Sequence, residues 1–88
     1  MALLELMGRR WTLRILWELR DGPLRFRTLR ERCGDVSPTV LNQRLRELRE
    51  AGIASLEEQG YCLTADGRDL LACLAPLNRW AERWKERV

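Results

Sequence analysis

The sequence contains no histidine, and its 88 residues include only three cysteines. Cys33, Cys62 and Cys73 lie far apart in the chain and show no Cys-x-x-Cys spacing. A zinc site therefore has too few ligands of the usual kinds. The lack of histidine also removes the commonest general base, and no other base stands beside a nucleophile in a recognisable pattern. We expect no metal, no cofactor and no catalytic residue, and hence a protein that is not an enzyme.

Long hydrophobic runs are missing as well. No stretch reaches the roughly 18 consecutive apolar residues that a transmembrane helix needs. The first residues, MALLELMGRRW, lack the basic segment followed by a long apolar segment that marks a signal peptide. An odd number of cysteines without a pairing pattern is typical of reduced thiols, and we expect these to be core thiols. We therefore expect a cytoplasmic protein with no membrane partner.

Lysine is nearly absent, because 15 of the 16 basic residues are arginine. The formal net charge of +3 hides an asymmetry. Residues 1–52 hold 11 arginines against seven acidic residues, a net charge of +4, whereas residues 53–88 hold five basic and six acidic residues, a net charge of −1. Arginine suits bidentate contacts with phosphate and with base edges. The N-terminal part is therefore the more suited to a nucleic-acid partner.

Apolar periodicity and helix-breaking residues predict the order of the elements. A glycine at position 8 marks a possible bend in the first helix, Gly34-Asp35 predicts a turn, and Pro76 predicts a kink in the last helix. The chain length fits one domain spanning residues 1–88. The expected elements are helices at 3–20, 24–33, about Ser37–Ala51 and 64–88, with short strands at 53–56 and 61–63 joined by a turn at 57–60. This order predicts a mainly α fold with a small two-stranded antiparallel β-hairpin, a winged helix-turn-helix.

The third predicted helix, within VSPTVLNQRLRELREAG, has a clear start and end. Ser37 is a favourable N-cap with proline directly after it, and Gly52 occupies the position of a C-terminal glycine. One side of the helical wheel is apolar, and the first two turns of the other side carry no acidic residue. Asparagine and glutamine can pair with adenine, arginine with guanine, and threonine with the thymine methyl group. The candidate base-reading residues are Thr39, Asn42, Gln43 and Arg46.

Arg44 differs from its neighbours, because its position falls inside the apolar arc of this helix. An unpaired charge there would be costly, so we expect a structural side chain that pairs with Glu47. Arginines that precede this helix are better candidates for phosphate contacts, since the second helix of a helix-turn-helix crosses the DNA backbone. The expected phosphate contacts are Arg10, Arg25, Arg27 and Ser37, with plain solvation as the alternative.

The segment GRRWTLRILWELRDGPLRFRTLRERCGDVSPTVLNQRLRELREAGI resembles the HxlR-type family of bacterial winged-helix transcription regulators. The resemblance spans about residues 5–84 and extends to the Leu63-Thr64 and Gly67-Arg68 pairs. It implies a MarR-like homodimer that binds double-stranded DNA, with the first and last helices at the interface. Two features depart from the family pattern. The turn LEEQG is short and acidic, where members often have a longer basic wing, and no cysteine precedes the first helix, so thiol sensing is not implied.

The last predicted helix carries an apolar stripe from Leu70 to Val88, which is roughly 27 Å long at 1.5 Å per residue. One small core does not need all of it, and large exposed apolar patches are rare on monomers. A pocket for a small molecule is the alternative use of its tryptophans, and no effector can be named. The expected dimer-interface residues are Trp11, Leu77, Trp80 and Trp84.

These features predict a homodimeric, sequence-specific DNA-binding transcription regulator. The helix from Ser37 would lie in the major groove, and the two subunits would bind half-sites about 34 Å apart on a pseudo-palindrome. The acidic wing would add little, because it would repel phosphate. The alternative is a winged helix that has lost DNA binding and serves as a protein-interaction adaptor. The short acidic wing and the modest net charge favour that alternative, whereas the acid-free start of the third helix favours DNA.

Overall fold

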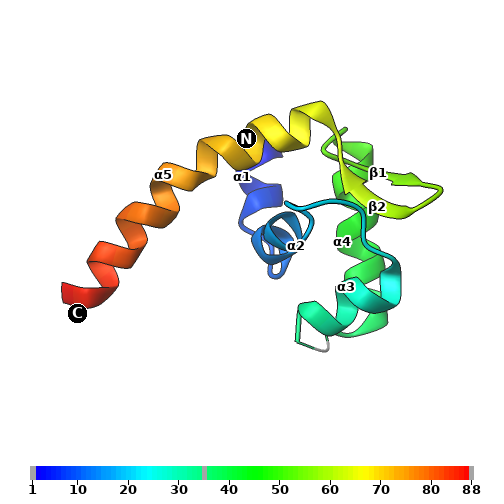
Figure 1. Cartoon of the computed structure of the whole chain (residues 1–88), viewed down its shortest axis with the longest axis horizontal. Helices are drawn as coiled ribbons and strands as arrows, with labels where there is room; N and C mark the ends of the chain where they lie inside the picture. Colours follow the sequence, from blue (N-terminus) through cyan, green and yellow to red (C-terminus); the bar gives the residue numbers. More distant parts are fainter. Residues whose placement is uncertain (1, 35, 88) are drawn as a thin grey trace.

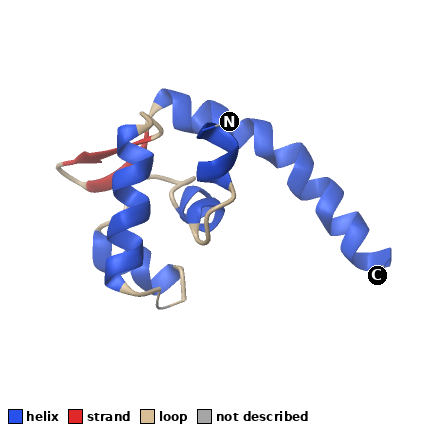
Figure 2. Ribbon diagram, turned by 180° about the vertical axis from the view of Figure 1, so that it is seen from behind, coloured by secondary structure: helices blue, strands red, loops and turns tan. Residues whose placement is uncertain are grey.

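The computed structural model describes residues 2–34 and 36–87, so the predicted turn at Gly34-Asp35 and the predicted helix end at Val88 lie partly outside the described residues. Within these ranges, helices precede and follow one β-hairpin (Figure 1). The fold prediction is confirmed, because the described chain is mainly helical with a two-stranded antiparallel sheet (Figure 2). The elements are α1 (Ala2–Met7), α2 (Thr12–Glu18), α3 (Phe26–Arg32), α4 (Pro38–Glu50), β1 (Ala54–Glu57), β2 (Gly60–Leu63) and α5 (Ala65–Arg87).

The single helix predicted for residues 3–20 is wrong, because the chain turns a corner between α1 and α2. The corner comprises Gly8 to Trp11, and Trp11 adopts a left-handed conformation with φ of 80°. A non-glycine residue pays roughly 1–2 kcal/mol for this conformation. The bend expected at Gly8 is therefore a complete break between two helices. The sequence did not indicate the break, because the apolar pattern continues on both sides of it.

The second predicted helix begins later than expected, because α3 starts at Phe26 instead of residue 24. Leu24 is extended and forms a β-bridge with Tyr61, with N–H···O distances of 2.9 and 2.8 Å in the two directions. The segment before α3 therefore pairs with the hairpin. Gly60 permits this approach, since a Cβ there would lie 2.5 Å from the carbonyl oxygen of Leu24.

The third predicted helix is confirmed as α4. The Ser37 Oγ accepts a hydrogen bond from the Val40 N–H at 3.1 Å, and Pro38 opens the first turn. Gly52 ends the helix with φ of 75°, a conformation that glycine adopts without strain. Leu41, Leu45 and Leu48 are fully or almost fully buried, so the apolar face identified on the helical wheel is the one that packs.

The hairpin is confirmed with its strands shifted by one residue at three of the four ends. β1 and β2 pair from Ala54↔Leu63 to Glu57↔Gly60, so that only Glu58 and Gln59 connect them. The base of the hairpin is fixed by Thr64, whose Oγ1 donates to the carbonyl oxygen of Gly52 at 2.6 Å. The Thr64 Oγ1 also accepts a hydrogen bond from the Gly67 N–H at 3.0 Å and thereby caps α5.

The last helix, α5, runs without interruption through Pro76 and changes direction near its middle (Figure 1). Proline removes a helical hydrogen bond and is a common cause of such a bend. The first half packs on the body, whereas the second half extends away from it and gives the molecule a longest dimension of 42 Å. None of the helices within residues 2–34 and 36–87 is both long and apolar enough to span a membrane.

The core lies where α2, α3 and α4 meet the hairpin. Its largest fully buried side chains include Ile15, Leu16 and Leu19 of the α2 segment. Residues from the other elements complete it and include Leu29, Leu41, Leu45, Leu48, Ile53 and Leu63. This core holds α4 by one face and leaves the opposite face free for contacts.

Candidate nucleic-acid interface

The polar face of α4 is fully available for an external contact. The side chains of Thr39, Asn42, Gln43 and Arg46, predicted to read bases, are all exposed. Among the described residues, no hydrogen bond or ion pair engages any of these four side chains. Their donors and acceptors point toward solvent from successive turns of one helix. Such an arrangement can form hydrogen bonds with base edges in a major groove, which admits an α-helix.

The start of α4 is held in place by the turn before it. The Arg30 Nε donates to the carbonyl oxygen of Val36 at 2.8 Å, and Val36 itself is buried. The Ser37 hydroxyl, predicted to contact phosphate, serves as the N-cap acceptor and keeps its own proton available for donation. The free N–H groups of the first turn face the same end, which favours an anion there.

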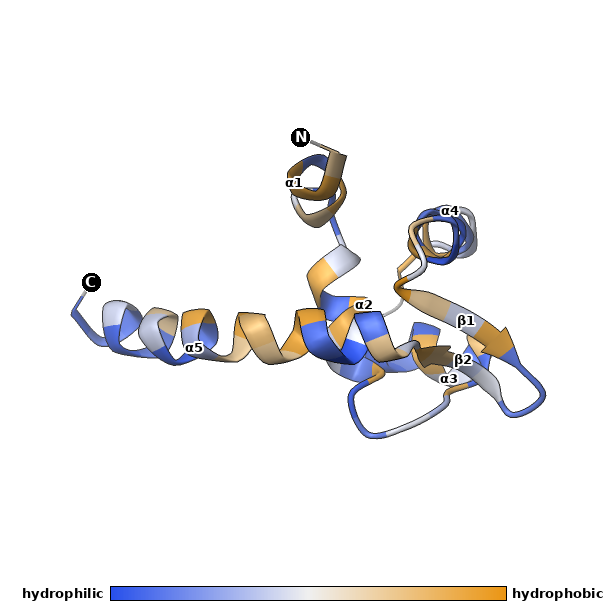
Figure 3. Ribbon diagram, turned by 90° about the horizontal axis from the view of Figure 1, so that it is seen from above, coloured by the Kyte–Doolittle hydropathy of each residue, from blue (hydrophilic) through white to orange (hydrophobic). Residues whose placement is uncertain are grey.

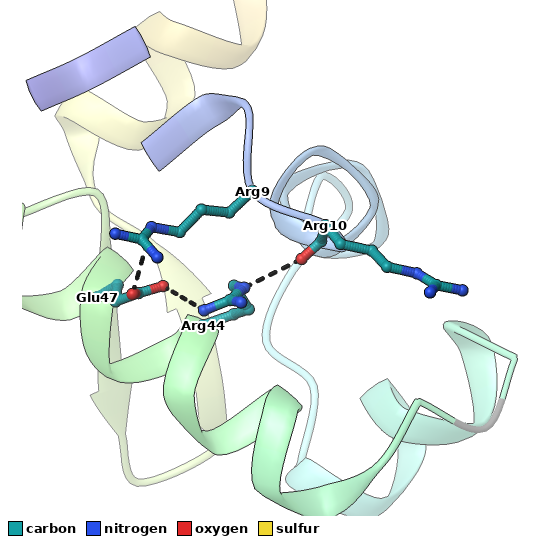
Figure 4. Close-up of polar contacts among 4 residues, drawn as sticks. All are labelled: Arg9, Arg10, Arg44 and Glu47. Carbon is teal, nitrogen blue, oxygen red and sulfur yellow. Dashed lines mark hydrogen bonds and ion pairs between the residues drawn. The ribbon is translucent and has the colours of Figure 1, made fainter. Parts of the chain in front are cut away.

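The two acidic residues near the end of α4 have different environments. Glu50 is exposed, whereas the Glu47 side chain is only 17% exposed and turns toward the α1–α2 corner. The Glu47 carboxylate lies 2.7 Å from the Arg44 Nη1 and 3.4 Å from the Arg9 Nε (Figure 4). The predicted pairing of Arg44 with Glu47 is therefore confirmed. This pairing neutralises the negative charge of Glu47.

The arginines predicted to contact phosphate lie beside α4 and make only weak internal contacts. The Arg25 guanidinium donates to the Glu58 carbonyl oxygen at 3.3 Å, which is long for a hydrogen bond. Arg27 is 92% exposed and pairs with Glu31 at 3.4 Å. Exposed pairs of this kind contribute little stability, so a phosphate could replace the carboxylate at little cost.

Arg10 has a different environment from these two arginines. Its carbonyl oxygen accepts a hydrogen bond from the Arg44 Nε at 3.0 Å, while its guanidinium lies 5.3 Å from the centre of the Trp11 ring. The side chain extends away from the Arg44–Glu47 pair (Figure 4). Contact of the Arg10 side chain with phosphate remains a prediction, whereas its backbone has a structural role that the sequence did not reveal.

Arg49 is a candidate residue that sequence reasoning left without a role. It lines a crevice of about 520 Å³ between α4 and β1, together with Arg46, Glu50, Ser55 and Leu56. Two guanidinium groups therefore stand next to the hairpin. The signal was present in the sequence, because Arg46 and Arg49 are three residues apart and lie on the same side of a helix.

The hairpin tip shows the acidic character expected from the sequence. Glu57, Glu58 and Gln59 are all exposed, and the connection is a two-residue loop. Neither carboxylate forms an ion pair within the described part of the chain. A tip with two free negative charges opposes contact with phosphate, so the basic residues of α3 and α4 would have to supply the affinity.

A second exposed surface lies on the other side of the molecule, between α2 and α5. It is an open apolar groove of about 570 Å³, and Arg20 covers one edge by stacking on Trp17 at 4.0 Å. The hydrophobic residues recur along α5 as it leaves the body (Figure 3). We define the α2–α5 groove by its apolar lining residues Leu13, Trp17, Leu63, Leu71, Ala72, Leu74, Ala75, Leu77 and Ala81.

The residues predicted for a dimer interface fall in two places. Leu77 lines the α2–α5 groove, and Trp80 and Trp84 follow it on α5 with rings stacked at 6.3 Å. All three are about half exposed, at 57%, 47% and 50%. Trp11 lies instead at the α1–α2 corner, partly buried against the protein's own core. Its part in an interface remains a prediction.

The three cysteines differ in exposure. Cys33 is buried, and this burial raises the pKa of its thiol. The nearby negative charge of Glu18 raises this pKa further, by a smaller amount. Cys62 is half-buried, with its sulfur 3.3 Å from the Ser55 hydroxyl. Cys73 is exposed, so its expected place in the core is wrong. Within the described residues, no three potential metal ligands cluster together.

A family model described as HxlR-like helix-turn-helix matches residues 6–88. An uncharacterised HTH-type transcriptional regulator of Mycobacterium tuberculosis H37Rv is 41% identical over 91 residues, covering 96% of this chain and 57% of its own length. The HTH-type transcriptional regulator YodB of Bacillus subtilis is 32% identical over 89 residues, covering 93% of this chain and 80% of its own length. The chain therefore spans a little over half the length of its mycobacterial relative.

Solved structures agree with these matches. Quinone-bound YodB from B. subtilis superposes with a TM-score of 0.87 at 33% identity, covering 93% of each chain. A possible HxlR family transcriptional factor from Thermoplasma volcanium superposes with a TM-score of 0.86 at 25% identity, covering 96% of this chain and 82% of that one. These relatives are regulators of transcription and not enzymes, in agreement with the prediction from the sequence.

Proposed function

Because the chain belongs to the HxlR-like helix-turn-helix family, we propose that it regulates transcription by binding specific DNA sequences as a homodimer. The family resemblance predicted from the sequence is thereby confirmed. The observation that supports DNA binding most directly is the outer face of α4. There, Asn42, Gln43 and Arg46 are exposed and engage no other described residue. The segment Ser37–Ala51 would lie in the major groove and read bases through these side chains and Thr39. Such a role places the protein in the cytoplasm with the DNA.

Phosphate contacts would surround this helix. Arg25 and Arg27 lie at the start of α3. Ser37 lies at the start of α4, where the free N–H groups of the first turn would face the phosphates of the same DNA strand. Arg10 would add a contact from the α1–α2 corner. These groups carry no sequence information but set the register of the protein on the duplex. The acidic hairpin tip would remain away from the backbone.

A second copy of the chain is the proposed occupant of the α2–α5 groove. The groove continues along α5 into Trp80 and Trp84, which the single subunit leaves half exposed. A patch of this kind is uncommon on a stable monomer. A two-fold partner that contributes the same helix would bury both patches at once. Dimerisation would then place two copies of α4 on half-sites about one helical turn apart.

Affinity for a random-sequence duplex, measured against salt concentration, tests DNA binding. We expect the logarithm of the association constant to fall linearly with the logarithm of salt concentration, because each arginine–phosphate contact releases a counterion. With four to six such contacts per dimer, the slope would be about −4 to −5. Selection of bound sites from random DNA would then yield a pseudo-palindrome.

An adaptor without DNA binding is the second candidate. The exposed carboxylates of Glu57 and Glu58 and the apolar α2–α5 groove favour it, since both would suit a protein partner better than DNA. The same titration separates the two functions. The protein would first be shown by its mass to be dimeric. If this dimer binds no duplex, or binds it with an affinity that does not depend on salt, the adaptor function is correct and the regulator function is wrong.

A further inference from the structure

Four groups tie α4 to the α1–α2 corner, and together they form what we call the corner clamp. It consists of the side chains of Arg9, Arg44 and Glu47 and the carbonyl oxygen of Arg10 (Figure 4). The Arg44 guanidinium donates in two directions, to the Glu47 carboxylate at 2.7 Å and to the Arg10 carbonyl at 3.0 Å. The second carboxylate oxygen of Glu47 lies 3.4 Å from the Arg9 Nε. One carboxylate of α4 is thus held by two arginines from different elements.

The Arg44–Glu47 pair of the corner clamp is more protected from solvent than the Arg27–Glu31 pair of α3, whereas the Arg9 side chain is 49% exposed. The Arg44 and Glu47 side chains are 16% and 17% exposed, whereas Arg27 and Glu31 are 92% and 63% exposed. Charged groups removed from water interact more strongly and are screened less by salt. The clamp therefore has the character of a fixed internal contact and not of a passing surface contact.

α1, which precedes the corner, packs only partly on the rest of the molecule, through Leu6 and Met7. No residue of α1 is buried, and Leu3 and Leu4 are 44% and 64% exposed. The corner itself contains the left-handed Trp11. A strained residue persists only where its surroundings determine its conformation, and Arg44 binds the carbonyl oxygen immediately before Trp11. The clamp therefore connects α4 with a corner that contains one strained residue.

The rotation of α4 decides where its reading side chains point. Gln43 precedes Arg44, and Arg46 precedes Glu47, so both clamp residues of α4 are sequence neighbours of candidate base-reading residues. Successive residues of a helix differ by about 100° in direction. Fixing Arg44 and Glu47 on the inner side therefore fixes the direction of both neighbours on the outer side.

We propose that Glu47 and Arg44 are positioning residues for DNA reading, which set the orientation of α4 through the α1–α2 corner without touching DNA. This inference rests on the proposed function of α4. It separates two roles on α4: the exposed side chains contact the DNA bases, and the clamp sets the direction in which these side chains point. It also means that a displacement of α1 would alter sequence discrimination by α4, since the two are joined by the clamp.

Arg44→Lys provides the sharpest test, because lysine keeps the charge but cannot donate in two fixed directions as the guanidinium does. The variant and the wild type would be titrated with the selected operator duplex and with a scrambled duplex of equal length. We expect the ratio of operator to scrambled affinity to fall about tenfold, within the range of coupling between linked sites. The scrambled affinity and its salt slope should stay unchanged, because the number of phosphate contacts is the same.

Glu47→Gln and Glu50→Gln form a matched pair for the carboxylate. Both substitutions are nearly isosteric, both raise the net charge by one, and the two residues lie on the same helix, but only Glu47 belongs to the clamp. Any general gain in DNA affinity from the lost negative charge affects both duplexes and therefore cancels in the operator-to-scrambled ratio. We expect only Glu47→Gln to lower the operator-to-scrambled ratio. Equal ratios in the two variants would overturn the proposal.

A measurement without DNA examines the clamp itself. Amide hydrogen exchange at residues 8–12 should become faster in Arg44→Lys and Glu47→Gln and remain at the wild-type rate in Glu50→Gln. If the wild type discriminates the operator but the clamp variants do so equally well, the positioning role is wrong and the proposed function stands. If the wild type binds no duplex, the proposed function fails, and the positioning role fails with it even where exchange responds. Equal weakening on both duplexes by Arg44→Lys would identify Arg44 as a phosphate contact and refute positioning.

Discussion

At the scale of single residues, exposure separates the contact residues from the supporting ones. Gln43 and Arg44 are adjacent in sequence, yet the first is exposed and the second is mostly buried. Thr12 is an extreme case, because it is fully buried and its Oγ1 has no hydrogen-bond partner among the described residues. A buried polar group without a partner costs about 1–3 kcal/mol. Thr12 therefore weakens the core at the start of α2.

Thr12→Val should stabilise the fold, since it replaces the unpaired hydroxyl by a methyl group of similar size. We expect the free energy of unfolding to rise by about 1 kcal/mol and the melting temperature by roughly 4–8 °C. Calorimetric unfolding would measure both. Thr28→Val is the control, because Thr28 is exposed on α3 and the same chemical change there should have an effect within about 0.5 kcal/mol. A lower melting temperature for Thr12→Val would mean that the hydroxyl forms a stabilising hydrogen bond.

At the scale of elements, α4 combines three functions on different sides. Leu41, Leu45 and Leu48 anchor it in the core, Arg44 and Glu47 hold its orientation, and its remaining outer face is free. α3 supports it from the side and carries the arginines that would contact phosphate. The hairpin contributes an acidic tip, so it limits the DNA-facing surface on one side.

Gln43→Ala and Arg25→Ala should separate base reading from phosphate contact. Gln43 is exposed on α4, so its loss should change the preferred sequence at one position and cost about 1–3 kcal/mol on the operator. Arg25 carries one positive charge at the start of α3, so its loss should weaken all duplexes alike and reduce the salt slope by about one per subunit. Site selection and salt titration of both variants would measure these effects. Identical behaviour of the two variants would contradict the division of roles.

At the scale of the whole molecule, two surfaces face in different directions. The outer face of α4 is polar (Figure 3), whereas the α2–α5 groove is lined mainly by apolar side chains, and Trp80 and Trp84 continue it along the otherwise polar second half of α5. The separation suits a dimer that joins through one surface and binds through the other. Because α5 extends beyond the body, a partner could pack along it without covering α4.

Leu77→Glu should dissociate the proposed dimer. Leu77 lines the groove, and the substitution removes apolar area and adds a carboxylate that a dimer would bury, so the dimer dissociation constant should rise more than about tenfold. Analytical ultracentrifugation would follow the change in mass. Leu56→Glu is the matched control, because Leu56 is 48% exposed but lies on the hairpin away from the groove. A dimer unaffected by Leu77→Glu would place the interface elsewhere.

Local signals in the sequence were sufficient for α4, the hairpin and the pairing of Arg44 with Glu47. Ser37, Pro38 and Gly52 act within one turn of the helix, and the apolar period identifies the buried face without reference to distant residues. The carbonyl of Arg10, in contrast, meets Arg44 across 34 positions, and Leu24 meets Tyr61 across the α3–α4 segment. Nothing in a local pattern indicates such partners.

The sequence by itself determined the family, the exposed polar face of α4 and the acidic hairpin tip, because each depends on residue types at short spacing. Only the tertiary structure decided that the first helix breaks at Trp11, that Glu47 turns inward while Glu50 remains exposed, and that Cys73 lies outside the core. These outcomes depend on which elements pack side by side. A helical wheel gives the direction of a side chain around its own axis, but the neighbour present in that direction is set by the fold.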